Sequence, residues 1–395
     1  MPDVTIRPLT LDEVVRDFMP LVSYSFTATP PMFTEEQRET RRQYYEERTV
    51  IGVYEEETLM AGAGIIPMTQ NVRGTIYPMG GIAPVTTRPE ARRKGYARDV
   101  MQAAFQHMHN AGYSVTGLYP FRESFYERLG YVTFPQVRIA EFAATALAPL
   151  LRMTIPGRVT MQPMTEGFDT FRAYTLERQR ETHGMAYHPP SVARNRPNRN
   201  EEWVAVARHG DQILGVMLYK ITDFGGTFEV SQMHYSTGQG KYLLLQWIAR
   251  HIDQTKKVQI ELPAAANAET WLSDVDIKFH STTWVTAMGR ILDVQKIGGM
   301  AVGDGAFVAK IQDDLCPWNN GIFAFDAREG RLLVRELRSL PDCTLTIQGL
   351  SALVFGTHDP SDFVWRGWAQ HLGETTVRQM AVMFPRALPH MHEAY

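Results

Sequence analysis

The chain has 395 residues, of which 44% are hydrophobic, so it can bury the cores of two or three domains. Its 40 basic and 43 acidic side chains leave a net charge of −3, which gives no reason to expect nucleic acid as the main partner. The two cysteines, Cys316 and Cys343, are too few for a disulfide framework or a CxxC metal site, and they fit a reducing cytoplasm.

Targeting and metal signals are weak throughout the sequence. The N-terminus lacks the basic and then apolar regions of a secretory signal, and no apolar run approaches the ~20 residues that a membrane span needs. We therefore expect a cytoplasmic protein that does not enter a membrane. His390 and His392 have no third ligand at a suitable spacing, so we expect no metal site.

The first third of the chain predicts strands and helices in a mixed order. Helical patterns cover 12–18 and 34–48, and the second opens with a capping-box pattern from Thr34 to Gln37. The strands are expected at residues 4–7, 49–54, 59–67, 71–79, 80–86 and 113–119, with Glu55, Glu56 and Glu57 at the tip of the first hairpin. This order indicates a mixed α/β layer rather than a doubly wound parallel sheet.

The most informative stretch lies between residues 80 and 131. A strand ends at Val85-Thr86-Thr87, and the basic turn Arg92-Arg93-Lys94-Gly95 opens a helix at Tyr96-Ala97. Such a turn directs several backbone N–H groups to one place at the positive end of a helix dipole, which suits a pyrophosphate. A short helix then carries the aromatic motif Phe125-Tyr126-Glu127-Arg128-Leu129-Gly130-Tyr131.

The middle of the chain repeats this rhythm weakly. Beyond a seam near residues 149–163, strands at 203–207, 213–221 and 227–235 lead to Gly238-Gln239-Gly240, a helix at 241–252 and a strand at 258–262. The basic cluster and the aromatic motif are both missing. We interpret this segment as a degenerate copy that has lost its ligand site, so we expect Gly240 to tolerate substitution.

The last part of the chain has a third pattern. A helix is expected at 288–294, followed by short strands at 306–311, 321–326, 331–335 and 344–347 and by a helix at 350–355. The stretch Leu350-Ser351-Ala352-Leu353-Val354-Phe355-Gly356 resembles the last third of sterol carrier protein-2-like (SCP2-like) domains.

These motifs together carry a family resemblance. The spacing RxxGxA followed by FYxxLGY resembles the acetyl-CoA-binding core of GCN5-related N-acetyltransferases (GNAT). With the degenerate copy and the SCP2-like end, the whole chain resembles the Eis ("enhanced intracellular survival") family of mycobacterial aminoglycoside acetyltransferases. The resemblance implies an α/β fold with mixed sheets: a catalytic GNAT domain at 1–150, a degenerate GNAT-like domain at 151–284 and an SCP2-like domain at 285–395. It also implies a homohexamer.

The resemblance further implies roles for named residues. Tyr126 matches the general acid that protonates the departing CoA thiolate, and the free carboxylate of Tyr395 matches the general base. The residues implied to contact acetyl-CoA are Val85, Thr86, Thr87, Arg93, Lys94, Gly95, Tyr96, Ala97, Arg98, Phe121 and Arg122. Tyr96-Ala97 depart from the aliphatic residues that are frequent in the family, and we expect this to alter the packing under the pyrophosphate without removing the amide cradle.

Two classes of function follow from this reading. The first is acetyl transfer from acetyl-CoA to a primary amine, either of an aminoglycoside-type or other small polycation or of a protein lysine. The second is a lipid-binding or scaffolding protein in which the acetyltransferase fold is vestigial. The intact basic turn favours the enzyme, because loss of function would be expected to degrade residues 93–97, as it did near Gly240.

Overall fold

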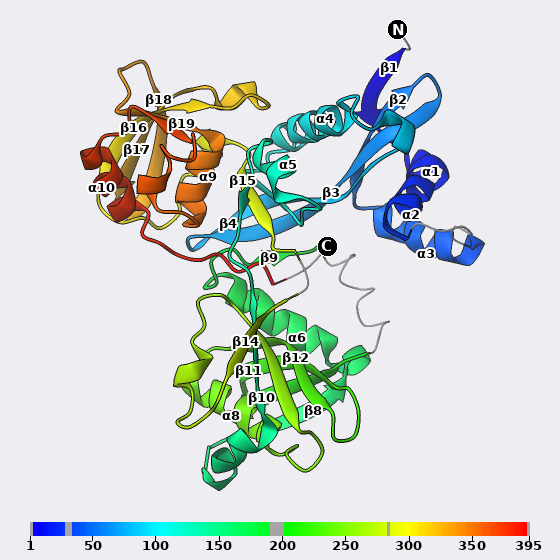
Figure 1. The fold of residues 1–395 in the computed structure, drawn as a ribbon, viewed down its shortest axis with the longest axis vertical. Coiled ribbons are helices and arrows are strands. Elements are labelled where there is room, and N and C mark those ends of the chain that lie inside the picture. The colour runs from blue at the N-terminus through cyan, green and yellow to red at the C-terminus, as the bar shows by residue number, and fades with distance from the viewer. Residues whose placement is uncertain (1–2, 28–33, 190–200, 283–284, 393–395) are drawn as a thin grey trace. The chain divides into compact units, whose positions relative to one another are not determined.

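The computed structural model describes residues 3–27, 34–189, 201–282 and 285–392. The chain forms two compact units that do not follow its linear order (Figure 1). The first unit combines Met1–Phe134, Gly184–Val192 and Ala287–Tyr395, and the second combines Pro135–His183 and Ala193–Thr286. Both ends of the chain therefore belong to one unit.

An eight-stranded mixed sheet forms the centre of the first unit. Its strands run in the order β1-β2-β3-β4-β5-β15-β6, and β9 pairs with β3 off this path. Their bounds are β1 Val4–Pro8, β2 Thr49–Glu55, β3 Thr58–Val72, β4 Thr75–Thr87, β5 Val115–Leu118, β6 Val132–Thr133, β9 Ala186–Tyr187 and β15 Met288–Ile291. The β4–β5 pair is parallel and its neighbours are antiparallel, so the mixed α/β class is confirmed.

The N-terminal helices begin with side-chain caps. Residues 11–27 form α1 (Leu11–Glu13), a π-helical turn (Val14–Phe18) and α2 (Met19–Thr27), and α3 (Glu35–Tyr45) follows. The capping box expected at Thr34 is confirmed, because its hydroxyl accepts from the Gln37 amide at 3.3 Å and the Gln37 side chain accepts from the Thr34 amide at 3.0 Å.

The long β3–β4 hairpin corrects the expected strands. The sequence predicted separate strands at 71–79 and 80–86, whereas β4 runs unbroken from a turn at Arg73 and Gly74. These two residues have φ values of 49° and 80°, the left-handed pair of a two-residue hairpin turn. Gly74 adopts that conformation without steric cost. The Arg73 guanidinium donates to the carbonyl of Val354 at 2.6 Å, which holds the other half of the turn.

Helix α4 (Tyr96–Asn110) packs on this sheet in the predicted way. Its buried face consists of Val100, Met101, Ala104, Phe105 and Met108, which recur at helical spacing. Gly80 on β4 faces this helix, and a Cβ there would lie 2.0 Å from the Met108 sulfur. The glycine therefore permits close contact between helix and sheet.

The C-terminal part of the first unit has its own five-stranded sheet, in the order β18-β17-β16-β19-β20. Its elements are β16 Ala306–Gln312, β17 Gly321–Arg328, β18 Arg331–Leu337, β19 Cys343–Thr346, α9 Ile347–Phe355, β20 Ala369–Gln370 and α10 Glu374–Met383. Phe307 and Phe325 stack at 4.9 Å in the core, and Phe323 and Phe355 are also buried. Both cysteines are buried and free.

The structure also corrects the element expected at residues 288–294. The sequence predicted a helix there, but Met288–Ile291 form β15, which inserts between β5 and β6 of the first sheet. All four residues are buried, because the strand has neighbours on both edges and packing on both faces. The sheet that carries the basic turn is therefore completed by residues that follow the second unit in sequence.

The second unit is built on a seven-stranded sheet, in the order β14-β7-β13-β12-β11-β10-β8. Its elements are β7 Arg138–Ala143, β8 Arg158–Pro163, α6 Met164–Gln179, β10 Trp203–His209, β11 Gln212–Ile221, β12 Thr227–Tyr235, α8 Gly238–Ala249, β13 Lys257–Leu262 and β14 Lys278–Ser281. The parallel pair β12–β13 brackets α8, as the parallel pair β4–β5 brackets α4. Strand β7 precedes the seam that we predicted near residue 150, yet it pairs inside this sheet. The predicted domain bounds stay a prediction.

Candidate active site

Strands β4 and β5 separate at the centre of the first sheet. They pair only over Met79–Gly81 and Val115–Gly117, although β4 continues to Thr87. The continuing part of β4 pairs with β3 on its other edge, in the register Ala63↔Val85 and Ala61↔Thr87. One edge of β4 near Val85, Thr86 and Thr87 therefore has no strand partner among the described residues. Backbone groups on such an edge can pair with an extended ligand.

An irregularity in the β3–β4 pairing follows closely after the point of separation. The β3–β4 register shifts between Ala63 and Ile65, and a Cβ on Gly64 would lie 2.4 Å from the Ala83 carbonyl oxygen. Two residues of β4, Ala83 and Pro84, lie opposite the single residue Gly64 of β3, and such a bulge is a frequent arrangement beside functional sites. Sequence reasoning did not single out Gly64, because an isolated glycine in a strand does not by itself reveal the close contact.

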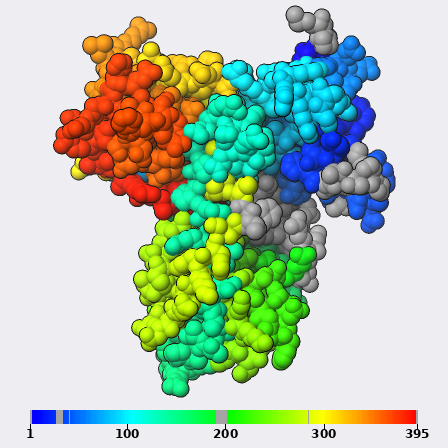
Figure 2. Space-filling view, viewed as in Figure 1, coloured from blue at the N-terminus to red at the C-terminus, as the bar shows by residue number. Residues whose placement is uncertain are grey.

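The basic turn at the start of α4 leaves its amides available. Arg93 and Gly95 have φ values of 66° and 97°, and Gly95 is the N-cap without a capping side chain. Along the start of α4, the first backbone amides that donate a hydrogen bond are those of Arg98 and Asp99, and both donate to the Gly95 carbonyl. In the described residues, the amides of Gly95, Tyr96 and Ala97 have no protein acceptor. This segment lies at the surface, as α4 (cyan) does in Figure 2.

The cations of the turn divide into two groups. Arg93 and Arg98 are exposed, whereas Lys94 pairs with Glu55 at the β2–β3 hairpin tip, at 3.0 Å. The Tyr96 hydroxyl also donates to Glu55, and this bond, followed by the Lys94 contact, lowers the pKa of that carboxyl. The departure at Tyr96 thus ties the turn to the hairpin, while the backbone amides stay free.

Tyr126 lies on α5 (Glu123–Glu127), the short helix after β5. Its side chain is 3% exposed and shares a core cluster with Leu118 and Ile82, where β5 ends and β4 diverges. Burial raises the pKa of its phenol well above the ordinary value. Within the described part of the chain, its hydroxyl has no hydrogen-bond partner. Tyr126 is therefore a protonated and unengaged donor.

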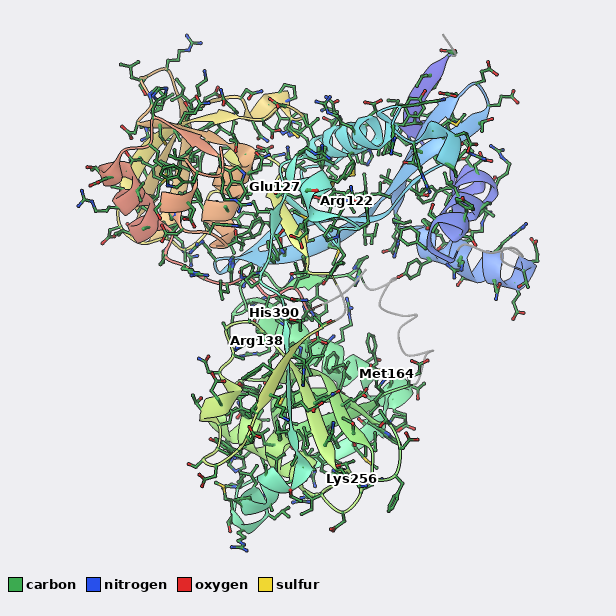
Figure 3. The ribbon with its side chains drawn as sticks, viewed as in Figure 1. Arg122, Glu127, Arg138, Met164, Lys256 and His390 are labelled. Atoms are coloured by element: carbon green, nitrogen blue, oxygen red, sulfur yellow. The ribbon has the colours of Figure 1, made fainter. Side chains whose placement is uncertain are left out.

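Phe121 and Arg122 precede this helix and are both exposed, Phe121 by 72%. The Phe121 ring lies 5.7 Å from that of Tyr126 and 5.4 Å from that of Phe125. Arg122 is the N-cap of α5, and Figure 3 marks it and Glu127 at the two ends of the helix. The predicted site residues thus form two groups in the first unit. One group lies at the end of β4 and the start of α4, and the other lies at α5.

The corresponding turn of the second unit has a side-chain cap for one of its amides. Thr237 caps α8, and its hydroxyl accepts from the Gly240 amide at 3.1 Å. A Cβ on Gly240 would lie 2.2 Å from the Leu214 carbonyl oxygen. The interpretation of this segment as a degenerate copy gains support from this cap. The expectation that Gly240 tolerates substitution is wrong for the fold of the second unit, because the helix contacts β11 there through backbone, whereas the expectation that its substitution leaves acetyl-CoA affinity unchanged stays a prediction.

We expect Gly240→Ala to destabilise the second unit, since an added methyl group must displace backbone, and overpacking of this kind costs ~1–3 kcal/mol. Thermal unfolding should show the loss. Gly238→Ala is the matched control, because it lies two residues earlier in the same helix and no atom lies within 4 Å of its added Cβ. Equal melting temperatures for the two variants would contradict the close contact.

The second predicted catalytic residue, Tyr395, lies outside the described residues, which end at His392. The tail before it is held in the first unit. Arg73 donates to the Pro385 carbonyl at 2.9 Å, and Gly184 packs against Pro389 and His390. The His392 ring lies 5.2 Å from that of Tyr187 on β9, which pairs with β3. The described tail thus leads from the C-terminal sheet to the first sheet.

Sequence reasoning missed a buried ion pair below the aromatic motif. Arg290 on β15 is fully buried, and its guanidinium donates to both carboxylate oxygens of Asp313, at 2.7 and 2.8 Å. Gly130, the glycine of the motif, has φ 95° and would place a Cβ 2.5 Å from Arg290 Nε. The sequence showed Gly130 as part of the aromatic motif, but nothing in the sequence indicated that Arg290 is buried in a strand.

Within the described ranges, no helix is long and apolar enough to cross a membrane. The same residues contain no group of three or more His, Cys, Asp and Glu side chains that could hold a metal ion.

Family models match three segments of the chain. Acetyltransferase (GNAT) domain models match residues 5–134 and 176–291, and a sterol carrier protein domain model matches residues 296–392. A search of the curated proteins finds no match to this sequence.

Solved structures share the whole fold at low sequence identity. A GCN5-related N-acetyltransferase from Anabaena variabilis is 19% identical with a TM-score of 0.85, and the match covers 100% of both chains. One from Kribbella flavida is 19% identical with a TM-score of 0.83, covering 100% of this chain and 99% of that one. Eis1 from Mycobacterium abscessus is 18% identical with a TM-score of 0.81, covering 100% of both. The chain thus contains two segments that match acetyltransferase (GNAT) domain models and a C-terminal segment that matches a sterol carrier protein domain model, and it shares its overall fold with these structures.

Proposed function

We propose that the protein transfers the acetyl group of acetyl-CoA to a primary amine, with residues 1–150 as the catalytic domain, 151–284 as the degenerate copy and 285–395 as the SCP2-like domain. The observation that carries the proposal is the set of three backbone amides of the basic turn that have no acceptor among the described residues. They follow an edge of β4 that has no strand partner there. Three unbonded N–H groups at a helix N-terminus suit an anion, and an unpaired strand edge suits an extended amide chain.

Acetyl-CoA offers both features to the protein. Its pyrophosphate would lie at the amides of Gly95, Tyr96 and Ala97, with exposed Arg93 and Arg98 adding positive charge. Lys94 would contribute through the field of the turn, because its ammonium already pairs with Glu55. The pantetheine arm would pair with Val85, Thr86 and Thr87, and Phe121 and Arg122 would flank it from the segment between β5 and α5.

The chemistry then needs a base, an oxyanion donor and an acid. The terminal carboxylate of Tyr395 takes a proton from the ammonium, and the free amine attacks the thioester carbonyl. A backbone N–H near Val85 donates to the oxyanion that forms. The attack forms the C–N bond together with this oxyanion, and when the tetrahedral intermediate collapses the C–S bond breaks and Tyr126 donates its phenolic proton to the departing sulfur. The nitrogen gives up its second proton, which restores the Tyr126 phenol, and the Tyr395 carboxyl releases its proton to water. A buried phenol with a raised pKa keeps that proton at neutral pH.

The acceptor that we propose is a small polycationic amine of the aminoglycoside type, acetylated at one or several positions, in a cytoplasmic homohexamer. This part follows from the resemblance to the Eis family. A protein lysine is the alternative acceptor. A lipid-binding role gains no support, because Phe307, Phe323 and Phe325 fill the core of the C-terminal sheet with exposures of 2% or less.

A calorimetric titration with acetyl-CoA, followed by a screen of amines for CoA release, tests the proposal. Mass spectrometry of the products would count the acetyl groups added. We expect one acetyl-CoA bound per chain and acetylation of small polyamines in preference to a lysine peptide. Failure to bind acetyl-CoA below millimolar concentration would remove the enzyme reading altogether.

Gly95→Ala should weaken acetyl-CoA binding while the fold survives. The position has φ 97°, where a Cβ is strained although its nearest neighbour, an Asp99 oxygen, lies 4.0 Å away. The strain, ~1–3 kcal/mol, would be relieved by turning the amides away from a common point. We expect a dissociation constant raised by about tenfold, since ~1.4 kcal/mol is one decade.

Gly74→Ala is the matched control for this measurement. Gly74 also has a positive φ, 80°, and open space around its added Cβ, but it lies in the β3–β4 turn. It should lose similar stability without changing acetyl-CoA affinity. Equal affinities for the two variants would remove the basic turn from the proposed site.

A further inference from the structure

The helix that carries Tyr126 is too short to hold itself in place. Helix α5 has five residues, and isolated helices of that length are unstable in water. The Tyr126 hydroxyl makes no hydrogen bond to the described residues, so its position depends on the packing of its ring and on the backbone of α5. Whatever fixes the end of this helix also fixes the phenol.

Two side chains of the C-terminal domain hold the last residue of α5. Gln348, at the start of α9, donates from its amide to the Glu127 carbonyl at 2.8 Å. Arg366 pairs with the Glu127 carboxylate at 3.1 Å. The Arg366 guanidinium also lies 4.0 Å above the Trp368 ring, which limits its freedom. Glu127 is the residue directly after Tyr126, so both contacts act one peptide away from the phenol.

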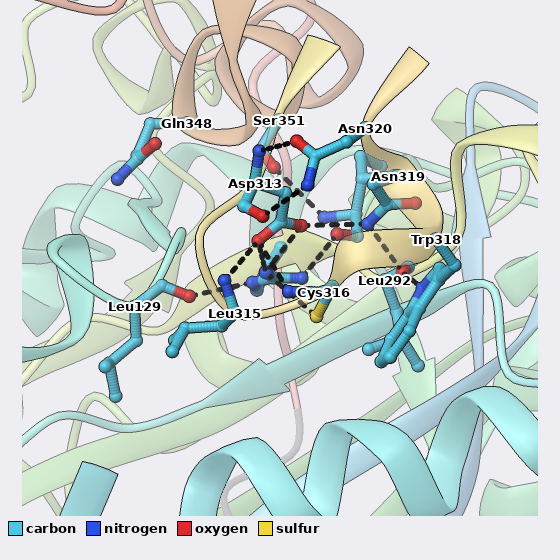
Figure 4. Close-up of polar contacts among 12 residues, drawn as sticks. Leu129, Leu292, Asp313, Leu315, Cys316, Trp318, Asn319, Asn320, Gln348 and Ser351 are labelled. Atoms are coloured by element: carbon cyan, nitrogen blue, oxygen red, sulfur yellow. Dashed lines mark hydrogen bonds and ion pairs between the residues drawn. The ribbon is translucent and has the colours of Figure 1, made fainter.

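The turn after α5 is held by the buried ion pair. Arg290 Nε donates to the Leu129 carbonyl at 2.8 Å, and its Nη2 donates to Asp313. Asp313 is fixed in turn by the amides of Leu315 and Cys316 and by the side chain of Asn319 (Figure 4). Asp313 is the first residue of the loop between β16 and β17, and therefore belongs to the segment that matches the sterol carrier model.

We propose that the sterol carrier domain positions Tyr126 for proton transfer through Gln348, Arg366 and Asp313, the last of which acts through Arg290 of β15. This inference rests on the proposed function of Tyr126 as general acid. These side chains come from residues 290–366 and reach the backbone or carboxylate of residues 127–129 from outside the N-terminal GNAT segment. The domain thereby acts on the reaction without contacting acetyl-CoA through these groups.

The double variant Gln348→Ala/Arg366→Ala tests this proposal with little risk to the fold, because neither side chain is fully buried. A misplacement of ~1 Å can cost about 10²-fold in rate, so partial release of α5 should lower kcat by roughly tenfold. The KM for acetyl-CoA should stay unchanged, since the turn at Gly95 is untouched. Arg366→Lys, which keeps the ion pair with Glu127, should recover most of the loss attributed to Arg366.

Arg335→Ala is the matched control for Arg366→Ala. Arg335 is also a partly exposed arginine of the C-terminal domain in an ion pair, with Asp326 at 2.6 Å, but its partner lies on β17 and not on α5. Its removal should leave kcat unchanged. A similar loss of kcat in both variants would mean that any damage to the domain slows the enzyme, and would overturn the proposal.

The same double variant placed in a Tyr126→Phe background separates positioning from general stability. If Gln348 and Arg366 act through Tyr126, their removal should lower kcat very little once the phenol is gone. An equal loss of kcat in both backgrounds would overturn the inference. If Tyr126→Phe alone keeps wild-type turnover, the acid role itself is wrong and the inference falls with it, whereas acetyl-CoA titration reports separately on the proposed substrate.

Discussion

Replacing Tyr126 by phenylalanine should lower turnover by ~10²–10⁴-fold, the usual contribution of a general acid. The ring packs against Phe125 at 5.0 Å and Tyr131 at 6.0 Å, and phenylalanine keeps both contacts. Because the hydroxyl has no hydrogen-bond partner among the described residues, its removal breaks no bond that supports the fold. Release of CoA thiol, measured under saturating acetyl-CoA, gives the turnover directly.

The acetyl-CoA affinity and the melting temperature of this variant should both stay near the wild-type values. Tyr113→Phe is the matched control, because Tyr113 packs against the same core cluster and burial raises its pKa as well. It should retain full turnover. Wild-type turnover in Tyr126→Phe would move the proton donor to another group or to water.

The pH dependence of this loss follows from the direction of the pKa shift. Burial raises the pKa of Tyr126 above its ordinary value near 10, so the phenol stays protonated from acidic pH through moderately alkaline pH. The ratio of wild-type to Tyr126→Phe turnover should therefore be constant between about pH 6 and 9. A ratio that collapses within this range would indicate that another group titrates in its place.

The sequence predicted the parts of the site that depend on local pattern. The basic turn, the helix after it and the short aromatic helix occupy adjacent stretches of chain, and each has a direct signal in residue type and spacing. The hairpin tip at Glu55 was visible for the same reason. Its bond to Tyr96 was not, because it joins residues 41 positions apart.

The parts that could not be predicted depend on distant pairing. Strand β15 contains glycine and a fully buried arginine within four residues, and neither residue type favours a strand. Its identity as a strand comes from its two neighbours in the sheet, β5 and β6. Arginine is rarely buried without a partner, so the position of Arg290 becomes reasonable only when Asp313 is beside it.

The two long hairpin strands show the same limit at shorter range. Residues 71–79 alternate well enough to suggest a strand of their own, and Arg73 conceals the turn because arginine seldom adopts positive φ. What permits that conformation is the set of carbonyls of Val354, Leu353 and Pro385, which accept from the Arg73 guanidinium. These lie about 280 residues or more away in sequence.

Extending the chain beyond Tyr395 by a few residues should reduce turnover by ~10²-fold or more, because the extension converts the terminal carboxylate into an amide. A terminal carboxylate has a reference pKa of about 3.3–3.7, so it is ionised at neutral pH and is a weak base. It can still take a proton from an ammonium directly or through one water, and partial desolvation would strengthen it. Tyr395→Phe should be nearly silent, since it leaves the carboxylate in place.

The described tail makes this measurement interpretable. Arg73 holds Pro385, and burial lowers the pKa of Arg73 to about 10, which still leaves it charged at neutral pH. Three residues span at most about 10 Å, so a base at Tyr395 would have to act within that distance of His392, where the described tail ends. The same extension at the N-terminus is the control and should leave turnover unchanged. If the C-terminally extended chain acetylates amines as fast as the native chain, the base is another group, and the route of the tail toward β9 then has only a structural purpose.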